Sequence, residues 1–189
     1  METLEASRSQ FDLVHGATSC TSTSCLFART MLERSPCKED LNKILEAGAV
    51  IWKKWKTTYP SNRTHQTWVD VQKTYPGIFE GVDIYYETNG YVGSTQENQD
   101  FLLATIDTCV EKLTADDEPR SAIFTTNESS YGLNHQNNQF YFFDSHGSTR
   151  TNGNAYVLRL HSADDVKTFL SSNFQEHAEF SLVVLRLAP

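Results

Sequence analysis

Helical spacing of apolar residues characterises the first third of this chain, whereas strand-like alternation characterises its second half. The spacing predicts one helix from Cys20 to about Arg34 and a second helix that Ser35 caps and that ends at Tyr59-Pro60. Shorter helices are expected over 67–74, 96–113 and 162–172, and strands over 82–86, 91–92, 121–126, 139–144, 155–160 and 180–187, with a tight turn at Asn89-Gly90. Helices followed by a run of strands, with one helix inserted, predict an α+β fold in which helices pack on a mostly antiparallel central sheet.

Length and charge limit the classes of protein to which the chain can belong. Its 189 residues fit one globular domain, and neither a repeat nor a linker divides them, so we expect a single domain over residues 1–189. No apolar run approaches the length of about 18 residues that a membrane span needs. The 24 acidic and 16 basic side chains give a net charge of −8, which suits a basic partner better than nucleic acid or an anionic membrane. We therefore expect the domain to bind neither nucleic acid nor membrane.

The four cysteines, Cys20, Cys25, Cys37 and Cys109, are too few and too irregularly spaced for a disulfide framework. The segment Met1–Glu5 lacks the basic start and apolar core of a secretory signal, so we expect reduced thiols and a cytoplasmic location, with the nucleus also open. No Cys-x-x-Cys pair occurs, and Cys20 and Cys25 have no second Cys/His pair at zinc-finger spacing, so we expect neither a metal nor a cofactor.

Cys20 stands where a helix is predicted to begin, and that place favours reactivity. The helix dipole stabilises a thiolate there, and free backbone N–H groups of the first turn can stabilise an oxyanion. The small polar residues before Cys20 indicate that it can be reached from solvent or from a cleft, whereas Cys25 stands beside Leu26-Phe27 and is expected to face the core. A role as a small buried residue is the alternative for either thiol.

A thiolate nucleophile needs a histidine partner, and His146 is the candidate because an acidic residue precedes it at the end of an apolar strand. Residues i and i+2 of an extended strand point the same way, so Asp144 and His146 project side by side, about 6–7 Å apart at Cα. Asp144 can then fix the tautomer of the imidazole and favour its protonated form. An ordinary strand end, where Asp, Ser and Gly are common, is the alternative. Gln10, ten residues before Cys20, is a further candidate, as an oxyanion donor.

Together these residues resemble a known family. The order of Gln10, then Cys20-Thr21-x-x-Ser24, then Phe142-Phe143-Asp144-Ser145-His146 resembles the N-terminal deubiquitinating domain of the herpesvirus large tegument protein, which has tegument-like relatives in cellular and bacterial genomes. The resemblance continues through the lead-in Ser7–Phe11 and through Asp40–Gly48, which is similar to the D-L-x-x-x-L-x-x-G helix of the family. It spans about residues 6–187.

The resemblance implies a papain-like cysteine protease fold and a deubiquitinase that cleaves after the C-terminal glycine of ubiquitin or a ubiquitin-like modifier. It implies that Cys20 is the nucleophile and that His146 is its base and acid, oriented by Asp144. It further implies that the Gln10 amide and the backbone N–H of Cys20 hold the oxyanion. The partner is then ubiquitin or polyubiquitin, which we expect a monomer to bind.

One departure from the family's pattern concerns the residue before the cysteine. Many herpesviral members carry Gln there, whereas this chain has Ser19. The resemblance therefore leaves a viral, cellular or bacterial origin open, and the chain is either a piece of a larger protein or a stand-alone relative.

Ubiquitin's tail carries arginines, so an acidic wall is expected beside its path. The strand around 80–87 is the candidate, since Asp83 and Glu87 alternate there with apolar positions. Solvated charges on the outer face of a strand are the alternative.

Two other functions fit the same residues. One is a different Cys-His-Asp acyl enzyme, such as a deamidase, an acyltransferase or a transglutaminase-like enzyme. The other is a non-catalytic module that binds ubiquitin, although the intact set of Gln10, Cys20, Asp144 and His146 argues against it. Only a deubiquitinase should form an adduct at Cys20 with a ubiquitin C-terminal electrophile.

Overall fold

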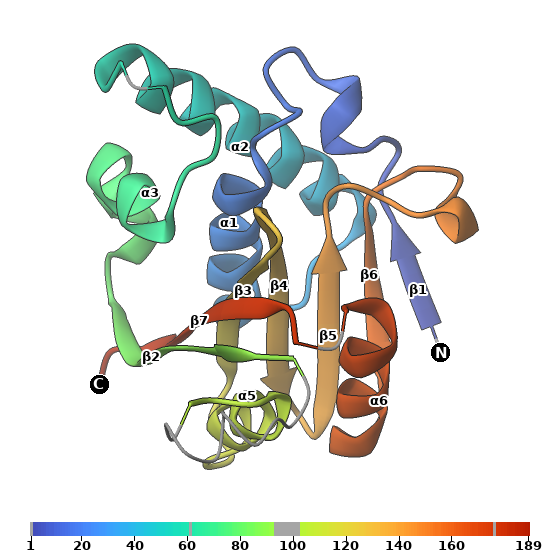
Figure 1. The fold of residues 1–189 in the computed structure, drawn as a ribbon. Helices are drawn as coiled ribbons and strands as arrows, with labels where there is room; N and C mark the ends of the chain where they lie inside the picture. The colour runs from blue at the N-terminus through green and yellow to red at the C-terminus, as the bar shows by residue number, and fades with distance from the viewer. Residues whose placement is uncertain (1, 61, 93–102, 176) are drawn as a thin grey trace.

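An antiparallel sheet lies between two layers of helices in the computed structural model, which describes residues 2–60, 62–92, 103–175 and 177–189 (Figure 1). Within these residues, seven strands follow the order β1-β6-β5-β4-β3-β7-β2 across the sheet. The strands are β1 (Glu2–Glu5), β2 (Val82–Tyr91), β3 (Arg120–Thr126), β4 (Ser129–Gln136), β5 (Gln139–Asp144), β6 (Tyr156–Leu160) and β7 (Glu179–Leu187). The predicted α+β fold with a mostly antiparallel sheet is confirmed.

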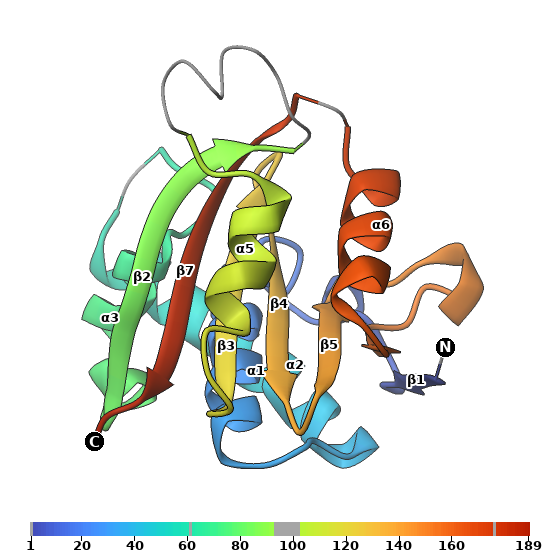
Figure 2. The ribbon, with the colours of Figure 1, turned by 90° about the horizontal axis from the view of Figure 1, so that it is seen from below.

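The helices divide between the two faces of the sheet, as Figures 1 and 2 show together. One face carries α1 (Cys20–Glu33), α2 (Lys38–Thr58) and α3 (Trp68–Thr74), and the other carries α5 (Ile106–Leu113) and α6 (Ala163–Asn173). No helix of the described residues combines the length and the apolar character needed to cross a membrane.

Each face of the sheet has its own apolar core, because successive strand residues point to opposite sides. On the α5/α6 face, buried strand residues such as Phe124, Phe142 and Leu182 pack with Val110 of α5 and Leu170 of α6. On the α1 face, two further clusters enclose α1, whose Phe27 ring stacks on Phe143 of β5 with 4.6 Å between the ring centroids. Helix α1 is therefore held against the middle of the sheet, and its first residue is Cys20.

A glycine lets α2 approach α1 closely behind this first turn. A Cβ atom at Gly48 would lie 2.3 Å from Thr23 Cγ2 and 3.1 Å from the Thr23 backbone nitrogen. Thr23 is buried and follows Cys20 by less than one turn. Gly48 thus sets the distance between the two helices at the end of α1 that carries the thiol.

We expect Gly48→Ala to lower the stability of the fold. Overpacking of this kind costs about 1–3 kcal/mol, which outweighs the gain of about 1 kcal/mol that alanine brings inside a helix. The matched control is Gly77→Ala, because a Cβ atom there would meet nothing within 4 Å. Thermal unfolding of both variants checks this. A melting temperature of Gly48→Ala at or above that of Gly77→Ala would contradict it.

Most predicted elements are confirmed, including α1, the start of α3 and the Ser162 cap of α6, whose Oγ accepts the Asp165 N–H at 3.1 Å. The predicted start of the second helix is wrong, because α2 begins at Lys38 with Cys37 as its cap. The Asp40 carboxylate accepts the Cys37 N–H at 2.9 Å and so caps the N-terminus of α2 at that residue. Ser35 instead accepts a hydrogen bond from Gln136.

The predicted turn at Asn89-Gly90 is also wrong, because both residues lie inside β2, opposite Ser181 and Phe180 of β7. A glycine is required at position 90 for packing, since a Cβ atom there would lie 2.1 Å from the Ala104 carbonyl oxygen. Strands β1 and β4 were not predicted. The part of the predicted 96–113 helix before residue 103 lies outside the described residues, and α5 accounts for its end.

Candidate active site

Cys20 lies at the first position of α1, in the turn whose backbone N–H groups have no partner within the helix. The side chain is not open to solvent as the sequence suggested, because the residue is only 1% exposed. Its Sγ lies 3.9 Å from the carbonyl oxygen of Glu128, at the tip of the β3–β4 hairpin. A substrate carbonyl must therefore approach the sulfur past this hairpin tip.

A chain of hydroxyl groups fixes the turn after Cys20. Thr21 Oγ1 donates to the Gln66 carbonyl at 2.9 Å, and it contacts Ser130 Oγ, also at 2.9 Å. Ser130 Oγ in turn lies 2.8 Å from Thr125 Oγ1. Because Thr21 donates its one hydroxyl proton to the Gln66 carbonyl, Ser130 must donate to Thr21, and Thr125 must donate to Ser130. The hydroxyl groups that follow Cys20 are thus hydrogen-bonded to distant segments, and sequence reasoning missed these partners.

Asp144 and His146 meet at the end of β5, as their i, i+2 spacing predicted. One carboxylate oxygen, Asp144 Oδ1, lies 2.8 Å from His146 Nδ1 and also accepts the His146 backbone N–H at 2.8 Å. The imidazole also contacts two aromatic rings, with centroid distances of 5.7 Å to Phe11 and 5.6 Å to Tyr131. The ring is held on three sides.

The electrostatics of Cys20 and His146 favour a thiolate beside an imidazolium. Burial works to raise the pKa of the Cys20 thiol, but the hydrogen bond and charge of His146, together with hydrogen bonds of the Ser130 backbone and of Thr21, outweigh it, so the pKa lies below its ordinary value. Burial works to lower the pKa of His146, but hydrogen bonds with Asp144 and Cys20, and their charges, raise it to about 9. At neutral pH the sulfur is thus prepared for nucleophilic attack.

Gln10 is fully buried beside this pair, though its side-chain amide contacts neither Cys20 nor His146 directly. Its Nε2 donates to the Ala17 carbonyl at 3.2 Å, and its Oε1 accepts from Ser145 Oγ at 2.8 Å. Gln10 therefore joins the loop before Cys20 to the residue between Asp144 and His146. An amide nitrogen carries two hydrogens, and Ala17 takes one of them.

The remaining thiols are poor candidates. Cys25 and Cys109 are buried, and burial raises the pKa of Cys109 to about 12 and that of Cys25 well above its ordinary range. Cys37 is exposed at the start of α2, and among the described residues it forms no hydrogen bond with a histidine. Within the described residues, His, Cys, Asp and Glu side chains form no group of three or more that could hold a metal ion.

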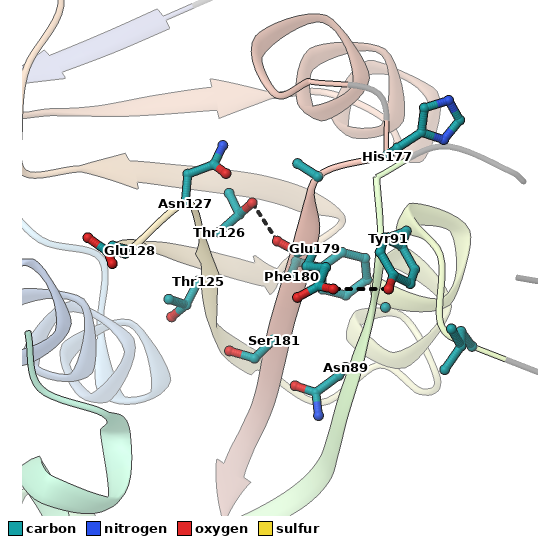
Figure 3. Close-up of a pocket in the computed structure, with 13 residues that line it drawn as sticks. Asn89, Tyr91, Thr125, Thr126, Asn127, Glu128, His177, Glu179, Phe180 and Ser181 are labelled. Atoms are coloured by element: carbon teal, nitrogen blue, oxygen red, sulfur yellow. Dashed lines mark hydrogen bonds between the residues drawn. The ribbon is translucent and has the colours of Figure 1, made fainter.

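A cavity of about 780 Å³ opens on the other side of the hairpin tip from Cys20. Glu128 lies at one end and Glu179, Tyr91 and His177 lie at the other, with Thr125 between them (Figure 3). The Glu128 carboxylate lies 3.7 Å from His65 Nε2, and Glu179 accepts a hydrogen bond from Tyr91 at 3.0 Å. Since the Thr125 proton is directed to Ser130, Thr125 Oγ1 adds an oxygen acceptor to those of Glu128 and Glu179 in the lining.

The expected wall of Asp83 and Glu87 does not form. Pairing with β7 places Ile84 opposite Leu185 and Tyr86 opposite Val184, so a β-bulge leaves Tyr85 unpaired. One extra residue reverses the alternation, and the two carboxylates point to opposite faces of the sheet. Asp83 pairs with Arg186 on one face at 3.7 Å, whereas Glu87 accepts from Trp68 Nε1 of α3 on the other at 3.0 Å.

Comparisons with known proteins address the fold and the family of the chain. No curated protein matches the chain in sequence. The crystal structure of the ubiquitin-specific protease encoded by murine cytomegalovirus tegument protein M48, in complex with a ubiquitin-based suicide substrate, has a TM-score of 0.76 to this chain at 17% identity, covering 98% of this chain and 85% of that one. This likeness confirms the fold. The family model of the herpesvirus tegument protein, N-terminal conserved region, matches residues 6–187, and the chain therefore belongs to that family.

Proposed function

We propose that this protein is a cysteine-type deubiquitinase that hydrolyses the peptide or isopeptide bond after the C-terminal glycine of ubiquitin. The observation that carries the proposal is the hydrogen bond of 2.8 Å between Asp144 and His146 Nδ1, together with the interaction of His146 with Cys20, which lowers the thiol pKa and raises the imidazole pKa to about 9. Membership of the tegument family and the fold shared with a ubiquitin-specific protease support the choice of substrate.

The chemistry follows from the placement of these three groups. The Cys20 thiolate attacks the glycine carbonyl, and N–H groups of the first turn of α1 stabilise the oxyanion, together with the Gln10 amide. The His146 imidazolium gives its proton to the departing lysine amine and, as neutral imidazole, then activates the water that releases the acyl-enzyme. Asp144 holds the ring with Nδ1 toward itself and Nε2 toward the reacting atoms.

The cavity beyond Glu128 is the proposed path of the ubiquitin tail. It begins beside the carbonyl that lies 3.9 Å from Cys20 Sγ, and Glu128, Glu179 and Thr125 offer acceptors along it (Figure 3). Arginine side chains of an extended tail suit such a lining. Glu87 lies on the same strand face as Asn89, which also lines the cavity. The Glu87 carboxylate therefore adds to the acidic residues along the proposed path.

We expect neutralisation of the cavity carboxylates to weaken substrate binding. Partly exposed ion pairs contribute about 0.2–1 kcal/mol each, so Glu128→Gln and Glu179→Gln should each raise KM by up to about fivefold at low salt. High salt should reduce the difference, since it screens these charges. Steady-state hydrolysis of a ubiquitin C-terminal fluorophore measures it.

The matched control is Asp83→Asn, which removes the same charge on the opposite face of the sheet and should leave KM unchanged. Equal effects of all three variants would indicate general charge steering rather than contact in the cavity. An unchanged KM in both Gln variants at low ionic strength would remove the cavity from the substrate path.

Hydrolysis assays with ubiquitin and with ubiquitin-like modifiers test the proposed function itself. We expect turnover of the ubiquitin substrate. Tight binding of ubiquitin without turnover would favour a binding module, and turnover of small acyl or amide substrates alone would favour another acyl enzyme.

The partners and compartment proposed for the domain follow from its surface chemistry. We propose that it acts as a monomer in the cytoplasm, with no role for nucleic acid or membrane. The net charge of −8 and the four cysteines, all described and none in a disulfide, support this.

A further inference from the structure

Two fully buried polar residues form a reciprocal pair beneath the candidate site. The Gln10 backbone N–H donates to the Ser145 carbonyl at 2.9 Å, and Ser145 Oγ donates back to Gln10 Oε1 at 2.8 Å. Both residues are 0% exposed. Ser145 lies between Asp144 and His146, so the pair joins Gln10 directly to the segment that carries the imidazole.

The surroundings fix which way the Gln10 amide faces. The Ala17 carbonyl can only accept, so the amide atom 3.2 Å away from it must be Nε2, the donor. Oε1 then faces Ser145, and the serine hydroxyl must donate to it. With Nε2 held on the side of the loop that leads into Cys20, one N–H bonds to Ala17 and the second remains for an incoming group.

The Ser145 hydroxyl is therefore needed as a hydrogen-bond donor, and an apolar side chain of similar size could not replace it. Without it, Oε1 would be a buried acceptor with no donor, an arrangement that destabilises a folded protein. A flip of the amide would not help, because Oε1 would then face the Ala17 carbonyl. The unpaired Oε1 could then find a donor only if the Gln10 side chain rotated away from its present position.

We propose that Ser145 is a positioning residue, which acts through Gln10 by holding Nε2 where it donates to the oxyanion. This inference rests on the proposed function. It assigns a role to a residue between the two members of the Asp-His pair that contacts neither substrate nor sulfur.

A double-mutant cycle with ubiquitin-fluorophore hydrolysis tests it. Gln10→Ala should lower kcat by about 10²–10³-fold, the usual effect of losing one oxyanion donor. Ser145→Ala should lower kcat at least tenfold with KM unchanged, and should cost nothing further in the Gln10→Ala background, because both changes remove the same contribution. Additive losses, or a Ser145→Ala enzyme with the kcat of the wild type, would overturn the proposal.

Two further variants separate positioning from folding. Ser145→Cys keeps the volume and replaces the hydroxyl with a weak donor, so its kcat should fall between those of wild type and Ser145→Ala. Ser148→Ala is the matched control, since its hydroxyl contacts Thr151 and not Gln10, and its kcat should match the wild type. Equal losses in Ser145→Ala and Ser148→Ala would overturn the proposal.

One readout does not depend on activity. The side-chain NH₂ protons of Gln10 should be protected from solvent exchange in the wild type and in Ser148→Ala, and lose protection in Ser145→Ala. Protection that survives in Ser145→Ala would overturn the positioning role even if the enzyme hydrolyses ubiquitin. Wild-type protein that hydrolyses no ubiquitin, with Gln10 protected as described, would instead contradict the proposed function.

Discussion

Replacement of Cys20 with alanine is expected to abolish ubiquitin hydrolysis while the fold stays intact. The expected loss is about 10⁶-fold in kcat, the scale seen when a hydrolase loses its nucleophile. The fold should survive because the thiol contacts mainly the Glu128 carbonyl, at 3.9 Å, and the His146 side chain, whereas hydroxyl groups hold the turn that follows it. Steady-state rates and a thermal melt of the variant check both parts.

Cys25→Ala is the matched control, because Cys25 is buried in the same helix one and a half turns later. Burial raises its thiol pKa well above the ordinary range, so it is not a nucleophile at neutral pH. We expect a modest loss of stability with kcat retained. Activity that survives in Cys20→Ala, or that is lost in Cys25→Ala despite a folded protein, would contradict the assignment.

Replacement of His146 with alanine is expected to be nearly as damaging as the loss of Cys20. This change removes the group that stabilises the thiolate, the acid that protonates the leaving amine and the base that activates water. Asp144→Ala should cost less, about 10⁴-fold in kcat, since Asp144 orients the ring and does not react. The same fluorogenic substrate ranks the three variants, and a His146→Ala enzyme more active than Asp144→Ala would contradict these roles.

The pH dependence of kcat/KM gives a separate test of the Asp144–His146 contact. Activity needs the thiolate and the imidazolium together, so it should rise as Cys20 ionises and fall as His146 loses its proton near pH 9. Asp144 raises the pKa of His146, so in Asp144→Asn the falling limb should move to lower pH. A falling limb that does not move would show that other groups hold the proton on His146.

Much of this site could be predicted from sequence because its residues follow local rules. The i, i+2 spacing placed Asp144 beside His146, and the apolar spacing placed Cys20 at the start of α1. Neither inference needed knowledge of the tertiary fold.

What the sequence did not reveal depends on contacts between distant segments. The burial of Cys20 comes from the β3–β4 hairpin tip, more than one hundred residues away, and β4 itself was not predicted. The separation of Asp83 from Glu87 comes from a bulge that only pairing with β7 defines. The alternation of residue types around 80–87 is the same with or without that bulge, so no local signal could have corrected the prediction.

Covalent capture tests the central claim most directly. Wild-type protein would be incubated with ubiquitin that carries a C-terminal electrophile, and the modified residue would be mapped by mass spectrometry. We predict one ubiquitin per chain, attached at Cys20, with no adduct in Cys20→Ala or in wild type that is first blocked with a thiol reagent. An adduct at the exposed Cys37, or no adduct from a folded wild-type protein, would contradict the account.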